Sequence, residues 1–260
     1  RLTDQPLMVT VIGADVYAPI RYDRMRPVLN LINFKHILRA ADHVVTSSTD
    51  MRDRLPANIR QKTTVIPYNV DPEKFIPPES KTGSGRLLTV CRLVERKNIK
   101  TALEVVAALR ENGREVTYTI AGDGPQQEEL VAYAEQLGIN DHVEFLGYVD
   151  HDRLPDIYRD HDVFFLPSHH EGFGIVYLEA MASGLPVVAS DEGGQTDFVT
   201  PSVGRLAPAD RPDLLVEALK DCLDEREKMG TAARERVLEQ YTPEVTAKNY
   251  IDVYELVQDE

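Results

Sequence analysis

Residues 169–190 read HHEGFGIVYLEAMASGLPVVAS, and this stretch decides the fold of the chain. A glycine-rich turn leads into an apolar segment that predicts a helix from about residue 174 to residue 183. The β-branched run PVVAS then predicts a strand. Two glutamates, Glu171 and Glu179, interrupt this apolar stretch. Since a buried carboxylate is costly without a partner, we expect both glutamates to meet polar groups.

The same alternation of strand and helix extends through the chain from residue 86 onward. The predicted strands are RLLTVC, EVTYTIA, HVEFL, DVFFLP and PVVAS. The predicted helices cover about residues 98–112, 125–137, 153–159 and 174–183, and another begins near residue 211. Short apolar strands that alternate with helices indicate a parallel sheet covered on both faces. The sequence therefore predicts a doubly wound, Rossmann-like α/β domain.

The first 85 residues are less regular. LMVTVI, HVVTSS and TTVIP predict strands, and a helix is expected over residues 30–41. Residues 68–85 are rich in proline and glycine, as linkers are. We therefore expect part of a second Rossmann-like domain with its linker over residues 1–80, the main domain over 81–240, and a last helix within 241–260 that packs back on the first part. Because Arg1 lies close to a strand, we expect the chain to be incomplete at its N-terminus.

The composition excludes some classes of partner. The net charge is −14, from 29 basic and 43 acidic residues, which argues against a nucleic-acid partner because such proteins need a basic surface. No apolar run approaches the roughly 20 residues of a membrane span, and we expect no signal peptide. Two cysteines in a chain of this length suggest reduced thiols and a cytoplasmic protein.

The loops that follow the predicted strands contain glycine or charge in five places, at residues 91–92, 122–124, 147–148, 168–174 and 191–194. In open parallel sheets, ligands bind beyond the carboxyl ends of the strands. Five such loops at one edge predict a cleft for a polar ligand.

One part of this cleft is suited to an anion. The turn from Glu171 to Gly174 leads directly into a helix, whose first N–H groups are unpaired and whose dipole is positive there. Phosphate is the usual ligand of such a site. Arg92 and Lys97 leave the first strand of the same domain, so we expect them to reach the same edge and to neutralise a diphosphate.

The two glutamates need a different ligand, because phosphates bind to cations and amides. Ionised carboxylates accept hydrogen bonds, and sugar hydroxyls donate them. A nucleoside diphosphate sugar has hydroxyls on both sides of its diphosphate, so Glu171 is expected to bind the sugar and Glu179 the ribose. The alternative for Glu179 is a solvent-facing helix residue or a core ion pair.

Metal ligation is weakly indicated. Residues 150–152 and 160–162 both read Asp-His-Asp, but the second group precedes its strand and the first resembles a helix cap. We expect no metal, since good sites need three or four convergent ligands. His169 and His170 lie in the glutamate loop, and contact of either with the ligand is left open.

These motifs resemble, in order and spacing, those of the retaining GT-B glycosyltransferases of the large family-four group. EGFGIVYLEAMASGLPVVAS resembles the E-x7-E signature, and CRLVERKN resembles the G-R-L-x-x-x-K loop. IAGDGPQQEEL resembles the G-x-G-P turn, FLGYV and DVFFLPSHHEGFG match in order, and VIPYNVDPEKFIP resembles the linker between domains. The resemblance covers about residues 7–250. Cys91 stands where the family usually has glycine, and Ile12 where it often has histidine.

The resemblance implies two Rossmann-like domains with the active site between them and a nucleotide-sugar donor on the C-terminal one. The donor, UDP- or GDP-linked, is a substrate, and no separate cofactor is expected. Transfer with retention is implied, with Arg92 and Lys97 on the departing diphosphate and Glu171 on the sugar. The implied donor-binding set is Gly122, Gly124, Gly147, Tyr148, Val149, Phe173, Gly174, Ile175 and Glu179.

The acceptor implied by the family is a carbohydrate or a lipid-linked hydroxyl, and the N-terminal domain is implied to bind it. Peripheral association with the inner face of a membrane and the oligomeric state are left open. Two other readings also remain open. One is a sugar-nucleotide epimerase or hydrolase of GT-B fold, and the other is a non-catalytic donor-binding fragment.

Overall fold

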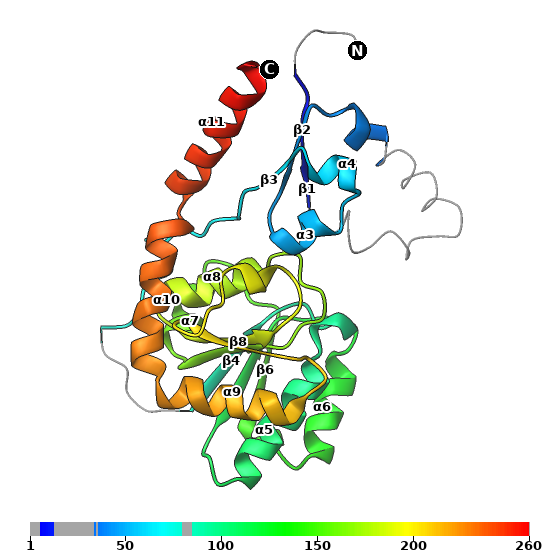
Figure 1. Cartoon of the computed structure of the whole chain (residues 1–260). Coiled ribbons are helices and arrows are strands. Elements are labelled where there is room, and N and C mark those ends of the chain that lie inside the picture. Colours follow the sequence, from blue (N-terminus) through cyan, green and yellow to red (C-terminus); the bar gives the residue numbers. More distant parts are fainter. Residues whose placement is uncertain (1–5, 13–33, 35, 80–84, 260) are drawn as a thin grey trace.

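The computed structural model describes residues 6–12, 34, 36–79 and 85–259, and contains two parallel sheets (Figure 1). The larger sheet has the strand order β6-β5-β4-β7-β8-β9. Its strands are β4 (Arg86–Val90), β5 (Thr117–Ala121), β6 (Val143–Gly147), β7 (Val163–Leu166), β8 (Val187–Ser190) and β9 (Gly204–Ala207). The chain runs outward from β4 to β6 and then returns to continue from β7 on the other side. This order confirms the doubly wound prediction, with the reversal point between β4 and β7.

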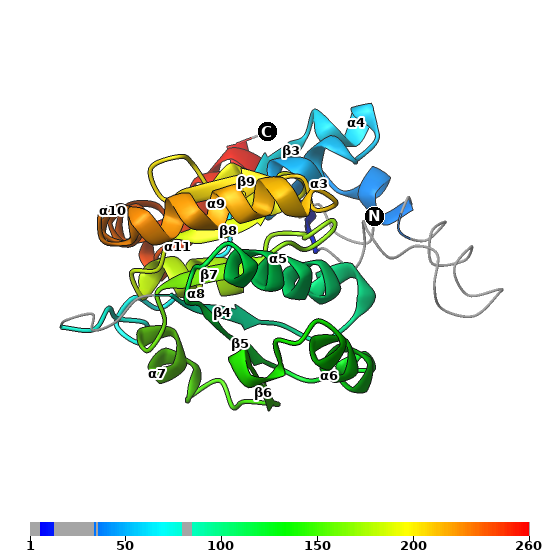
Figure 2. The same cartoon turned by 90° about the horizontal axis from the view of Figure 1, so that it is seen from below.

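Helices cover both faces of this sheet, as Figure 1 and the view from below in Figure 2 show. One face carries α5 (Ile99–Glu111), α6 (Gln127–Gln136) and α9 (Pro212–Asp224). The other carries α7 (Leu154–Arg159) and α8 (Ile175–Ala182), with α10 (Arg226–Gln240) packed on α8. Short 3-10 turns, η1 (Glu95–Lys97), η2 (Asn140–His142) and η3 (Gly194–Asp197), complete the connections.

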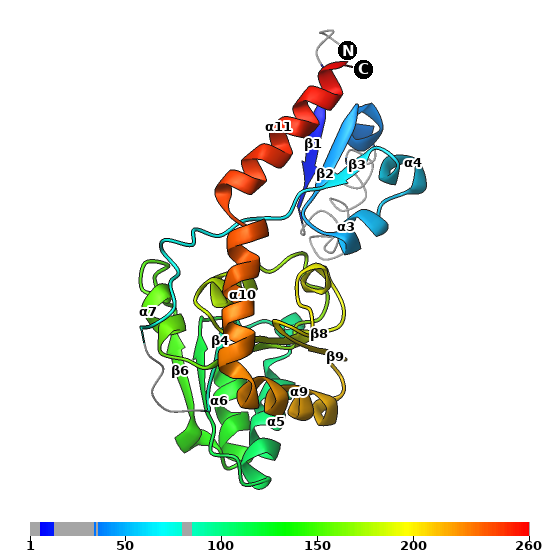
Figure 3. The same ribbon diagram turned by 60° about the vertical axis from the view of Figure 1, so that its left-hand side comes forward.

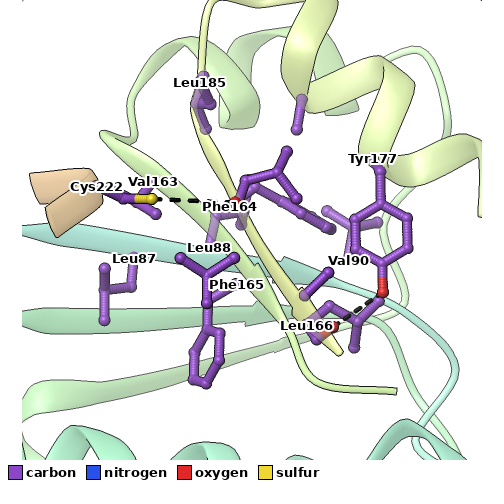
Figure 4. Close-up of a cluster of buried hydrophobic side chains, with 14 of the residues drawn as sticks. Leu87, Leu88, Val90, Val163, Phe164, Phe165, Leu166, Tyr177, Leu185 and Cys222 are labelled. Carbon is purple, nitrogen blue, oxygen red and sulfur yellow. Dashed lines mark hydrogen bonds between the residues drawn. The ribbon is translucent and has the colours of Figure 1, made fainter. Parts of the chain in front are cut away.

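The main core lies where the two helical layers meet the central strands (Figure 4). Leu87 and Leu88 of β4 and Phe164 and Phe165 of β7 are fully buried. Neighbouring side chains point to opposite faces of a strand, so both faces must be covered to bury them. The Tyr177 hydroxyl of α8 donates to the carbonyl of Leu166 at 2.9 Å, which fixes the helix over the end of β7.

Two elements of the larger domain escaped the sequence prediction, namely β9 and α10. Strand β9 reads GRLA and lies at the edge of the sheet, where only Gly204 and Ala207 are buried. Helix α10 buries four residues, Met229, Gly230, Ala233 and Val237. Both segments are too polar for a clear apolar pattern, and their packing against neighbours decides their structure.

The smaller sheet has the order β1-β2-β3, with β1 (Met8–Val11), β2 (His43–Thr46) and β3 (Thr63–Val65). Helices α3 (Thr49–Asp53) and α4 (Ala57–Arg60) follow β2. The helix expected over residues 30–41 lies partly outside the described residues, and residues 36–40 of it are helical. The expected domain boundary near residue 80 also lies outside them.

The last helix, α11 (Pro243–Asp259), runs from the larger domain up to the smaller sheet (Figure 3). Its Val253 and Val257 form a buried cluster with Val45 of β2 and with Ile66. Within the described part of the chain, no helix combines the length and the apolar character that crossing a bilayer requires.

Candidate functional site

Helix α8 begins at the reversal point of the large sheet, after the turn that contains Glu171. Gly174 precedes the helix with φ of 85°, and a Cβ atom at this position would collide with the Tyr177 ring. Only glycine can adopt this backbone without strain and clash. The backbone therefore turns tightly into α8, and no side chain caps its first N–H groups. The sequence predicts an anion site at this helix start, and the geometry is compatible with that prediction, which stays a prediction.

The loops that follow β7 and β8 lie side by side at this point. Glu171 and Gly193 form a parallel β-bridge, and the Gly194 N–H donates to the carbonyl of Glu171 at 2.7 Å. A side chain at either glycine would overlap the backbone of the neighbouring loop. Phe173 is buried between the two loops and stacks edge-on against Tyr68 of the linker. The turn is therefore held from two sides.

Glu171 is 8% exposed and pairs with two cations from the loop after β4. Lys97 Nζ bonds Glu171 Oε2, and Arg96 lies 3.5 Å from the same oxygen. Lys97 is itself 7% exposed, so the pair is desolvated on both sides. The His169 N–H donates to the carbonyl of Arg96 at 2.7 Å and ties the two loops together. The sequence predicts that Lys97 binds a diphosphate. In the structure, Lys97 forms an ion pair with Glu171.

Glu179 lies one turn into α8 and is 4% exposed. The Tyr158 hydroxyl donates to Glu179 Oε2 at 2.9 Å, and His151 Nε2 lies 3.1 Å from Oε1. Burial and the neighbouring carboxylate raise the pKa of Tyr158 well above its ordinary value, so this hydroxyl stays a donor. The carboxylate in the apolar segment thus has two partners, as its burial requires.

A pocket of about 370 Å³ opens beside the start of α8. Arg92, Gly122, Tyr148 and Val149 line it, and all four belong to the predicted donor-binding or catalytic set. Tyr148 is 73% exposed at its edge. Gly147 adjoins the pocket, because its carbonyl accepts from the Gly122 N–H at 2.7 Å. The ends of β4, β5 and β6 therefore meet in one hollow.

Cys91 connects this pocket with the charged pair. It lines the pocket, and burial raises the pKa of its thiol to about 12. The charge of Lys97 lowers this pKa and that of Glu171 raises it, both by less than burial does. Gly124 is the one predicted glycine that lies elsewhere: it lines a separate, open hollow beside α6.

The structure also identifies three residues that the sequence prediction did not include, Arg96, His151 and Tyr158. Arg96 is next to Lys97 on η1, and two adjacent cations in one loop were the available signal. The sequence analysis places His151 in a group that resembles a helix cap, and it assigns no role to Tyr158. Both lie more than 20 positions from Glu179 in the chain, so only the fold brings them together.

The other titratable residues near the site pair among themselves. His169 Nδ1 lies 2.8 Å and His170 Nδ1 lies 3.3 Å from the two oxygens of Glu192. Asp162 accepts from the Arg86 N–H at 2.9 Å, which puts the second Asp-His-Asp group at the amino ends of the strands. Among the described residues, no three His, Cys, Asp or Glu side chains converge as metal ligands would.

Comparison with known proteins agrees with this architecture. Residues 70–236 match the family model described as glycosyl transferases group 1. Glycogen synthase of Mycobacterium tuberculosis is 31% identical over 84% of this chain and 55% of its own length. The chain thus spans about half the length of this relative.

Solved structures give the same result. Sucrose-phosphate synthase from Thermosynechococcus elongatus superimposes with a TM-score of 0.81 and 26% identity, over 97% of this chain and 68% of its own. HepE of Anabaena, solved with UDP and glucose, has a TM-score of 0.79 and 21% identity over 96% and 71% of the two chains. The fold is therefore GT-B. From its sequence motifs, its fold and the geometry of this site, the chain belongs to the glycosyl transferases group 1 family.

Proposed function

We propose that this chain carries the donor site of a retaining glycosyltransferase, which moves a sugar from a nucleoside diphosphate sugar to a hydroxyl acceptor. The observation that carries the proposal is the pair of buried carboxylates, Glu171 and Glu179, on either side of the glycine turn that opens α8. Each is desolvated and already hydrogen-bonded, so each is a fixed acceptor for ligand hydroxyls.

The diphosphate of such a donor would lie between the two carboxylates. The first N–H groups of α8 have no side-chain cap, so they are available as donors to phosphate oxygens. Arg92 lines the neighbouring pocket and is exposed, so its guanidinium is available for bidentate contacts with phosphate oxygens. Lys97 and Arg96 add positive charge on the Glu171 side.

The pocket beside α8 suits the base and ribose of the nucleotide. Its size of about 370 Å³ is in the range of small-molecule sites, and the exposed ring of Tyr148 offers a stacking surface. HepE, which has the same fold, was solved with UDP and glucose, in agreement with a ligand of this class. The identity of the base stays open between uracil and guanine.

The reaction would need no side-chain nucleophile. The bond between the anomeric carbon and the diphosphate oxygen breaks, and the acceptor oxygen bonds to the same face of that carbon. The acceptor proton passes to the departing diphosphate. Arg92, Lys97 and the helix amides stabilise the negative charge that develops on the diphosphate, while Glu171 orients the sugar. The acceptor would be a carbohydrate or lipid-linked hydroxyl.

A panel of UDP- and GDP-linked sugars tests this proposal. We expect one of them to raise the melting temperature of the 260-residue chain and to show slow release of free sugar or transfer to an added acceptor. Glu171→Gln should reduce that turnover by about 10²–10³-fold, the scale of one electrostatic contact in a transition state. Because the substitution also leaves the buried Lys97 ammonium without its carboxylate, turnover is compared at a temperature at which the variant is fully folded. Turnover at the original rate, or no stabilisation by any nucleotide sugar, would contradict the proposal.

A further inference from the structure

The segment that joins the two domains is fixed to the helix that carries Glu179. The Arg234 guanidinium of α10 donates to the carbonyls of Pro72 and Phe75 in this segment, at 2.9 and 2.6 Å. It also donates to the carbonyl of Ala182, the last residue of α8, at 2.8 Å. One side chain thus satisfies backbone acceptors of both elements, and burial lowers its pKa. Residues 72–75 are part of the rigid surroundings of α8.

Lys74 of this segment controls the hydrogen bonding of His151. Lys74 Nζ lies 3.0 Å from His151 Nδ1 and 2.6 Å from Asp152 Oδ1. An ammonium group only donates, so Nδ1 must be the unprotonated nitrogen that accepts. The proton of the neutral ring is then on Nε2, which faces Glu179 Oε1 at 3.1 Å. Lys74 therefore selects the tautomer in which His151 donates to Glu179.

Phe75 supports both donors of Glu179 from the same side. Its ring centroid lies 5.7 Å from that of His151 and 5.7 Å from that of Tyr158, edge-on in both cases. Phe75 is buried, so its position is fixed by packing. The consecutive linker residues Lys74 and Phe75 thus contact the side chains that donate to Glu179. These donors are His151 and Tyr158.

We propose that Lys74 and Phe75 are positioning residues for Glu179, acting through the hydrogen bonds of His151 and Tyr158. The proposal rests on the proposed function, in which Glu179 accepts from the ribose. A carboxylate with both oxygens held by fixed donors keeps its remaining lone pairs in fixed directions for a ligand. When the donor on Oε1 is lost, the carboxylate can rotate, and the ribose loses an oriented acceptor. The linker between the domains is thereby a part of the donor site.

Calorimetric titration of the full chain with UDP, GDP and inorganic pyrophosphate tests this inference. Lys74→Met and His151→Ala change partly exposed side chains and are not expected to affect folding. We expect each to weaken binding of the preferred nucleoside diphosphate by about 5- to 20-fold, the scale of one hydrogen bond to a charged group. Binding of pyrophosphate, which has no ribose, should stay unchanged. His151→Gln, whose amide can donate to Oε1, should recover most of the lost affinity.

Matched controls are Lys228→Met and His142→Ala. Lys228 of α10 is highly exposed and forms an ion pair at 3.0 Å with Glu225, the residue that precedes this helix. His142 lies in η2, directly before β6. Neither should change nucleotide affinity. Equal loss of nucleotide and pyrophosphate affinity in Lys74→Met and His151→Ala would overturn the inference. It would also be overturned if His151→Gln bound the nucleoside diphosphate as weakly as His151→Ala does.

The variant Glu179→Gln separates failure of the inference from failure of the proposed function. If Glu179→Gln weakens nucleoside diphosphate binding while Lys74→Met and His151→Ala do not, the positioning role is wrong and the donor site stands. If Glu179→Gln leaves nucleotide binding intact, the ribose contact of the proposed function is wrong, and the positioning role falls with it.

Discussion

The hydroxyl of Ser48 donates to the carbonyl of Gly172 at 2.7 Å, across 124 positions of the chain. The same hydroxyl accepts from the Met51 N–H at 3.2 Å and so caps helix α3 of the smaller domain. Gly172 follows Glu171 directly in the turn that opens α8. One side chain therefore joins the N-terminus of a helix in one domain to the glutamate turn of the other.

Ser48→Ala should destabilise the protein by about 1 kcal/mol, because it removes the cap of α3 and the partner of the Gly172 carbonyl. Urea denaturation measures the change. Ser202→Ala is the control, since Ser202 is exposed and, within the described part of the chain, its hydroxyl bonds only to that of Thr200, at 3.0 Å. If the two variants unfold at the same urea concentration, the Ser48 contact does not stabilise the fold.

The buried ion pair of Lys97 and Glu171 should be required for activity, while its net contribution to stability is small. Among the described residues, Lys97→Met leaves the buried carboxylate only Arg96 as a cationic partner, at 3.5 Å, and should cost roughly 3–5 kcal/mol of the free energy of unfolding. The double variant Lys97→Met, Glu171→Leu removes both charges and should regain most of that stability.

Turnover of the donor should be lost in the single and in the double variant alike. Chemical denaturation and a donor-turnover assay on the same three proteins check both statements. A double variant that turns over donor at the original rate would rule out a catalytic role for the pair.

Gly122 should tolerate no side chain, because it packs against the backbone of the neighbouring loop. Its φ is 135°, and an added Cβ would overlap the carbonyl of Cys91. Gly113 has φ of 79° with nothing within 4 Å of an added Cβ. Gly113→Ala should therefore cost about 1 kcal/mol from backbone strain alone, and Gly122→Ala substantially more. Thermal unfolding compares the two, and equal melting temperatures would contradict the close approach of these loops.

Both cysteines should be inert in the folded protein. Burial raises the pKa of the Cys91 and Cys222 thiols from about 9.0 to about 12. At pH 8 neither should react with a thiol reagent such as dithionitrobenzoate on the timescale in which the protein unfolded in guanidinium reacts completely. Rapid modification of Cys91 in the native state would show that the pocket leaves the sulfur accessible.

The same shifts have a defined effect on stability. Because the folded pKa values lie above those of the unfolded chain, the thiols contribute stability that is fully present below about pH 9. That contribution is lost as the pH rises toward about 12. The free energy of unfolding should therefore fall between pH 9 and pH 11. Urea denaturation over this pH range should show a steeper fall in the unchanged protein than in Cys222→Ala.

The architecture of the larger domain could be predicted from sequence because its central strands are apolar on both faces. Val163 to Leu166 and Val187 to Ser190 are fully buried. Their short runs of mostly apolar residues therefore indicate buried strands. Strand β9 and helix α10 could not be predicted in this way, since each buries only part of its residues, two of four in β9 and four of fifteen in α10. Their position follows from contacts with β8 and α8 that no local pattern encodes.

The candidate site was predictable where the chemistry lies within one segment. Glu171, Gly174 and Glu179 stand at fixed spacing around one helix start, and a buried carboxylate signals a polar partner by itself. The partners were not predictable, because His151 and Tyr158 reach Glu179 from another element. The same holds for Lys74 and Phe75, because only the fold brings these linker residues into contact with His151 and Tyr158.

A crystal structure of the chain soaked with its preferred nucleoside diphosphate tests the central claim most directly. We expect the diphosphate at the first N–H groups of α8, with the Arg92 guanidinium on its oxygens and a ribose hydroxyl on Glu179. A nucleotide bound elsewhere on the molecule, or a ribose with no contact to Glu179 while the diphosphate lies away from Gly174, would contradict it.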